Sequence, residues 1–416
     1  MPIRLFTIVF ALTLACSPGA ERGPTRDGGP VTIPTTDGGP GVDGGPSTPA
    51  DFGPGPSGCG SAPGMDVDED GYVNGEDCND CSPQINPGAY DEPGNGSDED
   101  CSGADETAVT ECDASLAISG SAEDAARAMG LCRFVGASDP GWGVVSARFT
   151  RADGTGSPMS PLMTGVLPSL GAAAPTQGNA LLALSSGVAR SPSQTGWTSD
   201  CDTFGIEPDL FSGEFPASTE AFPPGFPVES PSCPGVRSGA VYNSVALEVQ
   251  IKVPTNALGF RFNSNFYTYE YPEFICDEYN DFFAVLYREE AGAWENIVFD
   301  TDGNPVSVNN SFLQVCTPGT HGGKTFACPL GRGLLSGTGY DGSATCGQPL
   351  FGSDPTVGAG TGWLQTTTAV TGGSTITLRF VIWDSGDPVL DSTALIDAFE
   401  WELDEIINDT ETVPLI

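Results

Sequence analysis

The sequence predicts an all-β protein whose main domain, residues 105–404, is a jelly-roll-like β-sandwich. Two observations predict this fold. The periodic segments alternate apolar and polar residues with the two-residue period of a half-buried strand, most clearly in 244–253 and 375–383. The chain also holds 56 Gly and 36 Pro among 416 residues, which supply the turns that many short strands require.

The clearest single strand covers residues 244–253. Its apolar positions from Val245 to Val253 face a core, while Glu248, Gln250 and Lys252 point outward. The turn 254–256 leads into a second strand, which is marked by Leu258, Phe260 and Phe262. Before these strands, Ser121 is the expected N-cap of one short helix.

Residues 375–403 form the segment around which the chain is organised, a strand, an acidic loop and a second strand. The first strand places Ile376, Leu378, Phe380 and Ile382 on one face. The second places Leu395, Phe399, Trp401 and Leu403 on the same face as Asp397. A lone carboxylate is costly to bury, so Asp397 needs a partner.

Two interpretations of this acidic loop stay open. In the first, the loop binds calcium, which takes six to eight oxygen ligands in irregular geometry. The ligands would be Asp384, Asp387, Asp391 and Asp397. In the second, the loop is acidic surface and Asp397 accepts hydrogen bonds from backbone amides.

Charge excludes some partners. The chain has 15 Lys and Arg against 55 Asp and Glu, a net charge of −40. Nucleic acid is excluded because phosphate binding needs a basic face, and direct adsorption to anionic lipid is excluded for the same reason.

The first 16 residues have the features of an export signal. Arg4 precedes an apolar run that is too short to span a bilayer. Residues 12–16 resemble a bacterial lipobox, so Cys16 is the expected lipidation site; an ordinary secretory signal is the alternative. Acylated Cys16 would be the only contact with a membrane, and would anchor the protein at the outer membrane or cell surface.

Two further segments lie outside the predicted modules. Residues 17–58 are rich in Gly and Pro, which predicts a disordered tether. Residues 405–416 are expected to be a C-terminal tail.

The sequence contains 13 cysteines. With Cys16 lipidated an even number remains, which fits disulfides in an oxidising compartment. Cys112 and Cys132 form one local candidate pair. A second local group contains Cys316, Cys328 and Cys346.

Residues 59–104 contain a calcium-loop pattern without flanking helices. Asp66, Asp68 and Asp70 take the first three ligand positions of an EF-type loop, and Gly71 takes the sharp turn. The remaining expected ligands are the Tyr72 carbonyl, Asn74 and Asp77. A second site is expected at Asp98 and Asp100, with Glu99 between them. The cofactor predicted for this module is Ca²⁺; the alternative is a solvated acidic run.

The same stretch resembles a metal-binding motif that occurs in repeats of many secreted bacterial proteins and is named after the MopE surface protein. The resemblance lies in DVDEDGY at 66–72, DCND at 77–80, INPGA at 85–89 and DEDCSG at 98–103. Cys78 and Cys81, with Cys59 and Cys101, are compatible with zinc, but disulfides are favoured in an exported protein. A copper site is not supported, because this stretch has no nearby histidine.

Residues 263–287 combine carboxylates with aromatic rings. As an exposed surface they would bind a sugar or a peptide, through Glu270, Tyr271, Glu273, Asn280 and Asp281. We favour the alternative, a core strand pair joined by an acidic loop that holds structural calcium, because buried aromatic residues usually only pack.

Residues from about 110 to 404 resemble the choice-of-anchor L domain of bacterial surface proteins. The matching stretches include AARAMGLCR at 125–133, EYPEF at 270–274, YNDFFAV at 279–285, GTGWLQT at 360–366 and residues 375–403. The resemblance implies surface display and carries no activity.

Enzyme motifs are scarce in this sequence. The single histidine, His321, lies in a Gly-rich loop, and metalloprotease, lipase and phosphate-loop motifs are absent. Three functions are therefore weighed. The first is a non-catalytic, calcium-stabilised surface lipoprotein that binds an extracellular glycan or protein. The others are a hydrolase of polysaccharide or peptide, which needs only two carboxylates, and a metal-sequestering surface protein.

Overall fold

We describe a computed structural model of residues 62–108, 111–197, 219–342, 356–407 and 410–415, all of which belong to one compact unit, Phe52–Ile416. The predicted signal, lipidation site Cys16 and tether 17–58 lie outside the described residues. No helix within the described part of the chain is long and apolar enough to cross a membrane.

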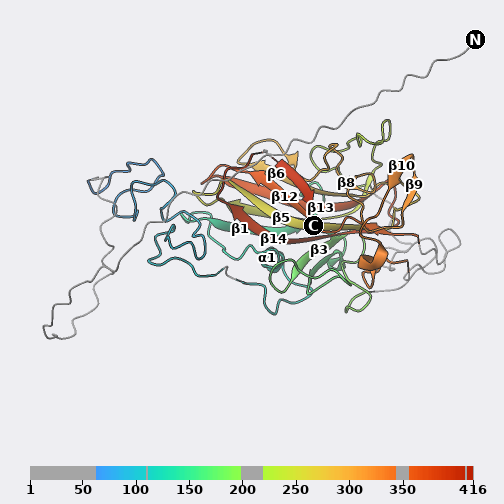
Figure 1. The fold of residues 1–416 in the computed structure, drawn as a ribbon, viewed down its shortest axis with the longest axis horizontal. Coiled ribbons are helices and arrows are strands. Elements are labelled where there is room, and N and C mark those ends of the chain that lie inside the picture. Colours follow the sequence, from blue (N-terminus) through green and yellow to red (C-terminus); the bar gives the residue numbers. More distant parts are fainter. Residues whose placement is uncertain (1–61, 109–110, 198–218, 343–355, 408–409, 416) are drawn as a thin grey trace, which may run out of the picture. The chain divides into compact units, whose positions relative to one another are not determined.

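The expected β-sandwich is confirmed: two antiparallel sheets form its layers (Figure 1). The first sheet has the order β1 (Gly143–Thr150), β4 (Val241–Lys252), β13 (Thr375–Ser385), β6 (Phe282–Glu289) and β7 (Glu295–Asn296), with β8 (Val306–Ser307) on β6. The second has the order β15 (Thr410–Pro414), β12 (Leu364–Ala369), β5 (Gly259–Thr268), β14 (Ser392–Glu402), β3 (Leu181–Ser185) and β2 (Thr164–Leu167), with β11 (Ala359–Gly360) on β5.

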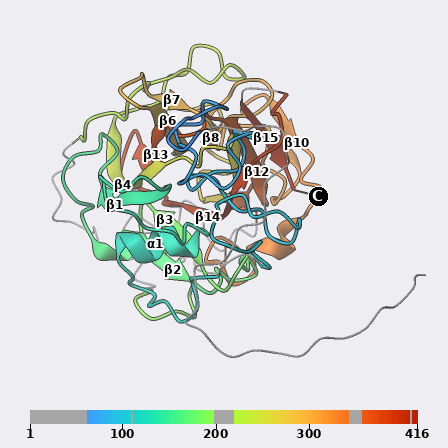
Figure 2. The same ribbon diagram turned by 90° about the vertical axis from the view of Figure 1, so that its left-hand side faces the viewer.

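The remaining elements are short. They are helix α1 (Ala122–Ala128), the 3₁₀ turns η1 (Pro161–Met163) and η2 (Arg332–Leu335), and the hairpin of β9 (Gly319–His321) and β10 (Lys324–Phe326). Helix α1 lies beside β2 and β3 (Figure 2). Ser121 caps it as expected, in a capping box with Asp124.

The main core lies between the two sheets. The rings of Phe380 on β13 and Phe262 on β5 meet edge to face at 5.3 Å across this interface. The inward positions expected for 245–253 and 376–382 are buried there, whereas Leu258 is exposed. The opposite face of β13 is also covered, because Trp383 packs against Phe226.

A β-bulge overturns the face that the sequence assigns to β14. Pairing with β5 shifts register between Asp397 and Glu400, where Ala398 adopts a positive φ of 52°. The shift moves later residues to the other face. Leu395 therefore packs in a satellite cluster while Phe399 enters the main core, and the expectation that they share a face was wrong.

Two further expectations concern the ends and the disulfides. Residues 410–414, expected in a tail, pair with β12 as strand β15. The local pair Cys112–Cys132 is bonded, as is Cys316–Cys328, and Cys233–Cys276 is a longer-range bridge. Cys346 lies outside the described residues.

An ion network ties three strands of the first sheet together. Glu248 on β4 lies opposite Arg148 of β1 and Arg379 of β13 in the strand register, and both arginines bond its carboxylate. Glu248 and Arg379 are 12% and 5% exposed. Burial alone would raise the pKa of Glu248, but hydrogen bonds and charge from the two arginines outweigh it and lower the pKa.

Replacing Glu248→Gln should lower the free energy of unfolding at neutral pH by about 3 kcal/mol, because it leaves a buried arginine without its counter-charge. Since the folded-state pKa is depressed, this stabilisation is present above the unfolded pKa and is lost as pH falls through the folded value. Urea denaturation at pH 7 and pH 3 should show the difference between wild type and variant shrinking in acid. Glu295→Gln, at an exposed position on β7, is the control.

Candidate functional site

Five aspartates form two overlapping groups in the loop of residues 66–80. Oxygens of Asp66, Asp68 and Asp70 lie within 4.8 Å of one another, as do oxygens of Asp68, Asp77 and Asp80. Gly71 has the positive φ, 96°, that the expected sharp turn requires. The two groups share Asp68, so the alternate spacing of the loop and the following turn converge.

Each of four aspartates uses one oxygen to hold the loop and leaves the other free. Backbone N–H groups of Gly71, Tyr72, Asn79 and Val67 donate, at 2.8–3.1 Å, to Asp66, Asp70, Asp77 and Asp80 respectively. Six buried carboxylate oxygens have no hydrogen-bond partner: Asp66 Oδ1, Asp68 Oδ1 and Oδ2, Asp70 Oδ2, Asp77 Oδ2 and Asp80 Oδ2. A cation that coordinates several oxygens at once would fit this arrangement.

The electrostatics of this group are unfavourable without a counter-charge. Burial and the charges of Asp70, Asp68 and Asp80 together raise the pKa of Asp77 to about 6, against the opposing hydrogen bond from the Asn79 amide. The pKa of Asp70 is also raised, by burial and by Asp68. No described Lys or Arg forms an ion pair with the group.

The ligand set predicted from the sequence omits Asp80, although the DCND stretch at 77–80 contains it. Asp80 lies beyond the twelve positions of an EF-type loop, and only the turn after Asp77 brings it back to Asp68. Of the other expected ligands, the Tyr72 amide bonds Asp70, and Asn74 is held by backbone bonds to Gly64 and Met65. Ligation by Tyr72 and Asn74 stays a prediction.

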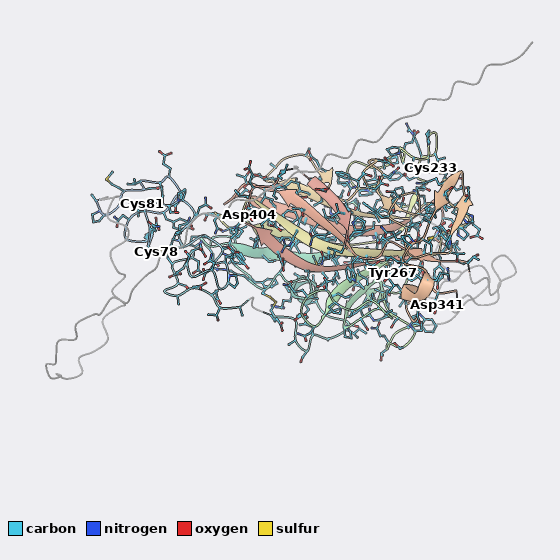
Figure 3. All side chains as sticks on the ribbon, in the orientation of Figure 1. Cys78, Cys81, Cys233, Tyr267, Asp341 and Asp404 are labelled. Carbon is cyan, nitrogen blue, oxygen red and sulfur yellow. A yellow bond between two sulfur atoms is a disulfide. The ribbon has the colours of Figure 1, made fainter. Side chains whose placement is uncertain are left out.

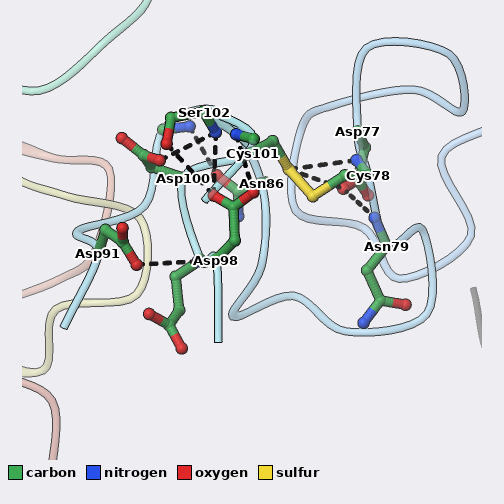
Figure 4. Close-up of a disulfide and its surroundings, with 12 residues drawn as sticks. Asp77, Cys78, Asn79, Asn86, Asp91, Asp98, Asp100, Cys101 and Ser102 are labelled. Carbon is green, nitrogen blue, oxygen red and sulfur yellow. Dashed lines mark hydrogen bonds between the residues drawn. A yellow bond between two sulfur atoms is a disulfide. The ribbon is translucent and has the colours of Figure 1, made fainter. Parts of the chain in front are cut away.

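The second acidic group differs from the first. Asp98 and Asp100 lie with Asp91, within 4.8 Å of one another. Here backbone amides satisfy the oxygens: Ser102 and Gly103 donate to Asp98, and Ser102 donates to Asp100 (Figure 4). The second metal site therefore stays a prediction, with less to support it than the first.

The cysteines of the module form disulfides. Cys78 is bonded to Cys101, beside Asp77 (Figure 4), and Cys81 is also disulfide-bonded. Figure 3 shows Cys78 and Cys81 in this module. Oxidised sulfurs are not thiolate ligands, so a zinc site built on these cysteines is excluded in this structure and the favoured disulfides are confirmed.

The module rests on the turn between β4 and β5. Asn256 accepts from the Tyr90 amide at 2.8 Å and donates to the Tyr90 carbonyl at 2.9 Å. Thr255 bonds Asn86 and the Gly88 carbonyl. A Cβ at Gly88 would lie 2.4 Å from the Tyr72 hydroxyl, so glycine is required for this approach. The INPGA stretch thus connects the aspartate loop to the sandwich.

The four aspartates of residues 384–397 do not form one group. Asp397 is buried and accepts from the backbone amides of Thr176, Gln177 and Ala398, which is the second interpretation given above. Burial raises its pKa, and these bonds oppose the rise. Asp384 accepts from the Asn243 amide at 2.9 Å. Only Asp387 and Asp391 remain at the loop, where both act electrostatically on Asp281.

The expected ligand-binding loop is largely interior. Glu270, Tyr271, Asn280 and Asp281 are each at most 2% exposed, and Glu273 alone of the five is exposed. The burial of these four residues agrees with the alternative favoured from the sequence, a core strand pair joined by an acidic loop. A role of these residues in binding an extracellular ligand stays a prediction, but a large ligand would not reach four of them in this conformation.

A cleft of about 700 Å³ lies where the module meets the sandwich. Three partly exposed rings line it: Tyr90 and Trp142 meet edge to face at 5.6 Å, and Trp142 and Trp401 at 6.3 Å. The Arg133 guanidinium lies 4.7 Å from the Trp142 ring, and Asp404, labelled in Figure 3, also lines the cleft. Sequence reasoning missed this cleft, because its rings come from three distant segments.

The family comparison concerns the segment that forms the central strands of both sheets. Residues 234–401 match the family model described as the Choice-of-anchor L domain. This match supports the expected domain over β4 to β14, and indicates an exported, surface-associated protein. No curated protein and no solved structure matches the chain. The MopE-type repeat and the lipid anchor stay predictions.

Replacing Asn256→Ala should loosen the module from the sandwich, because both backbone groups of Tyr90 lose their partner. We expect a loss of about 2 kcal/mol in local stability. Hydrogen exchange at the Tyr90 amide should accelerate by more than tenfold. Gln250→Ala, at an exposed position on β4, should leave exchange at that amide unchanged. Equal exchange rates in both variants would contradict a role of Asn256 in holding the module on the sandwich.

Proposed function

We propose that the protein is a non-catalytic cell-surface lipoprotein, anchored through Cys16, whose calcium-stabilised module and sandwich present a cleft to an extracellular glycan or protein. The match to the Choice-of-anchor L domain supports the surface location. The observation that carries the calcium assignment is the set of six unpartnered, buried oxygens on Asp66, Asp68, Asp70, Asp77 and Asp80.

The donor set favours calcium over other metals. All of the free donors are carboxylate oxygens, which suit hard cations, and calcium accepts six to eight of them in irregular geometry. Magnesium demands an octahedron of shorter bonds and keeps several waters. A bound divalent cation would also offset the repulsion among these five carboxylates, of which Asp77 and Asp80 are buried. The role proposed for it is structural, because it would join residues 66–70 to residues 77–80.

The cleft is the proposed ligand site. Tyr90, Trp142 and Trp401 supply ring faces and edges for stacking, and Arg133 supplies hydrogen-bond donors, a combination that suits a sugar or a peptide. Two of its carboxylates are engaged, since Asp397 bonds backbone amides and Glu400 pairs with Arg261.

Calcium should raise the melting temperature of the EDTA-treated protein. Binding to the folded state alone adds about 2.7 kcal/mol at 100 times the dissociation constant. Asp68→Asn combined with Asp77→Asn should remove the site and its share of this gain, because both free oxygens of Asp68 and one of Asp77 lose charge. Glu69→Gln, an exposed change in the same loop, should retain it. Calorimetry and thermal melts that show no difference between these variants would refute the assignment.

Replacing Trp142→Ala should weaken ligand binding by about tenfold or more, since loss of a central aromatic contact removes at least 1.4 kcal/mol. Arrays of glycans and peptides would identify the ligand with the wild type, and titration would compare the variants. Trp363→Ala, another partly buried tryptophan that lies outside the cleft lining, is the matched control. Equal affinities for the two variants would place the ligand elsewhere.

A further inference from the structure

The cleft between the module and the sandwich has a strongly acidic lining. Among the described residues that line it, ten carry a carboxylate and three are arginines, and none is a lysine or a histidine. An amide that donates to a carboxylate stabilises its charged form, so Asp113, which accepts from the Ala180 amide, still contributes to this balance. A concave surface lined by charges of one sign attracts ligands of the opposite sign.

The arginines of the lining do not neutralise these carboxylates. Arg261 pairs with Glu400 and Glu402 of the lining, so two negative charges share one positive charge. Arg127 pairs with Asp124, which lies outside the lining. The other eight carboxylates of the lining form no ion pair within the part of the chain that the structure describes. The cleft therefore keeps an excess of negative charge.

The aromatic wall of the cleft already holds one cation of the protein itself. The Arg133 guanidinium lies 4.7 Å from the centre of the Trp142 ring. Tyr90 and Trp401, which meet this ring edge to face, are partly exposed beside it. The negative face of an aromatic ring attracts a guanidinium or an ammonium group. The same wall would thus accept a lysine or arginine side chain of a ligand.

The carboxylates lie close to the rings rather than on distant walls. Burial raises the pKa of the Tyr90 hydroxyl, and the negative charges of Glu400 and Glu92 raise it further. Asp91 and Glu106 act on Tyr90 in the same direction. These four carboxylates come from the module and from β14, on the two sides of the cleft. Ring faces and negative charge therefore meet at one place.

We propose that the ligand of the cleft is a basic segment of an extracellular protein, which places a lysine or arginine side chain against the Tyr90 and Trp142 rings. This inference rests on the proposed function and narrows its ligand from a glycan or protein to a cationic peptide. A neutral sugar would use the rings alone, whereas lysine or arginine would use both the rings and the carboxylates. The net charge of −40 adds long-range attraction for such a partner.

The test titrates labelled decapeptides of alternating glycine and lysine, or glycine and arginine, into the full chain at low salt. A third decapeptide, with acetylated lysines, keeps the length and loses the side-chain charge. We expect both cationic peptides to bind at least about tenfold more tightly than the acetylated one, because acetylation removes the ammonium group. Their binding should weaken as sodium chloride is added, since salt screens exposed charges.

Matched variants locate the binding. Glu106→Gln combined with Asp404→Asn removes two charges from exposed positions of the lining and should weaken cationic peptides by about fivefold. Glu278→Gln combined with Glu295→Gln removes two charges from exposed positions outside the lining and should change the affinity by less than about twofold. Trp142→Ala should weaken the same peptides by about tenfold. Thermal melts confirm that each variant is folded.

The outcomes separate this inference from the proposed function. Equal weakening by the two double variants would indicate adsorption to the acidic surface as a whole and would overturn the inference. Cationic peptides that bind no better than the acetylated one would also overturn it. A neutral glycan that needs Trp142 would overturn the inference and support the proposed function. If no glycan or peptide depends on Trp142, both the inference and the proposed ligand site are wrong.

Discussion

Negative charge taken out of water without a matching positive charge is the constraint on which the rest of this structure depends. With 55 acidic residues and only 15 Lys and Arg, most carboxylates must stay in solvent, bond to backbone amides or share a cation. The described residues use the first two solutions, and we propose the third for the loop 66–80. Asp397 and Asp113 bond amides, whereas the groups at Asp68 and Glu270 keep buried oxygens that no amide reaches.

Three arginines form ion pairs with glutamates of neighbouring strands in the two sheets. Arg379 and Arg148 flank Glu248 across β13, β4 and β1, and Arg261 pairs with Glu400 and Glu402 across β5 and β14. Paired charges directly opposite one another on neighbouring strands support the register that the hydrophobic faces require. Among the described residues, none of these ion pairs includes an aspartate of the loop 66–80, where the cation site is proposed.

The aspartate loop and the proposed ligand cleft are linked through a short path. Asn86, Gly88 and Tyr90 follow the loop and bond the turn between β4 and β5, and Tyr90 then lines the cleft beside Trp142. A cation that orders the loop would thus also order one wall of the cleft. This coupling would give the structural role proposed for calcium a functional consequence without requiring chemistry at the metal.

Short-range spacing determined much of this protein from sequence alone. The alternation in 244–253, the Ser121 cap and the DxDxDG loop depend on residues a few positions apart, and the structure places each as the local pattern requires. Tertiary structure alone decided the rest. A single bulge after Asp397 reversed the face of Phe399, and the return of Asp80 to Asp68 depends on a turn. The bond from Ser392 to Asp281 depends on strand pairing between distant segments. Such contacts follow from register and long-range packing, which a local period does not encode.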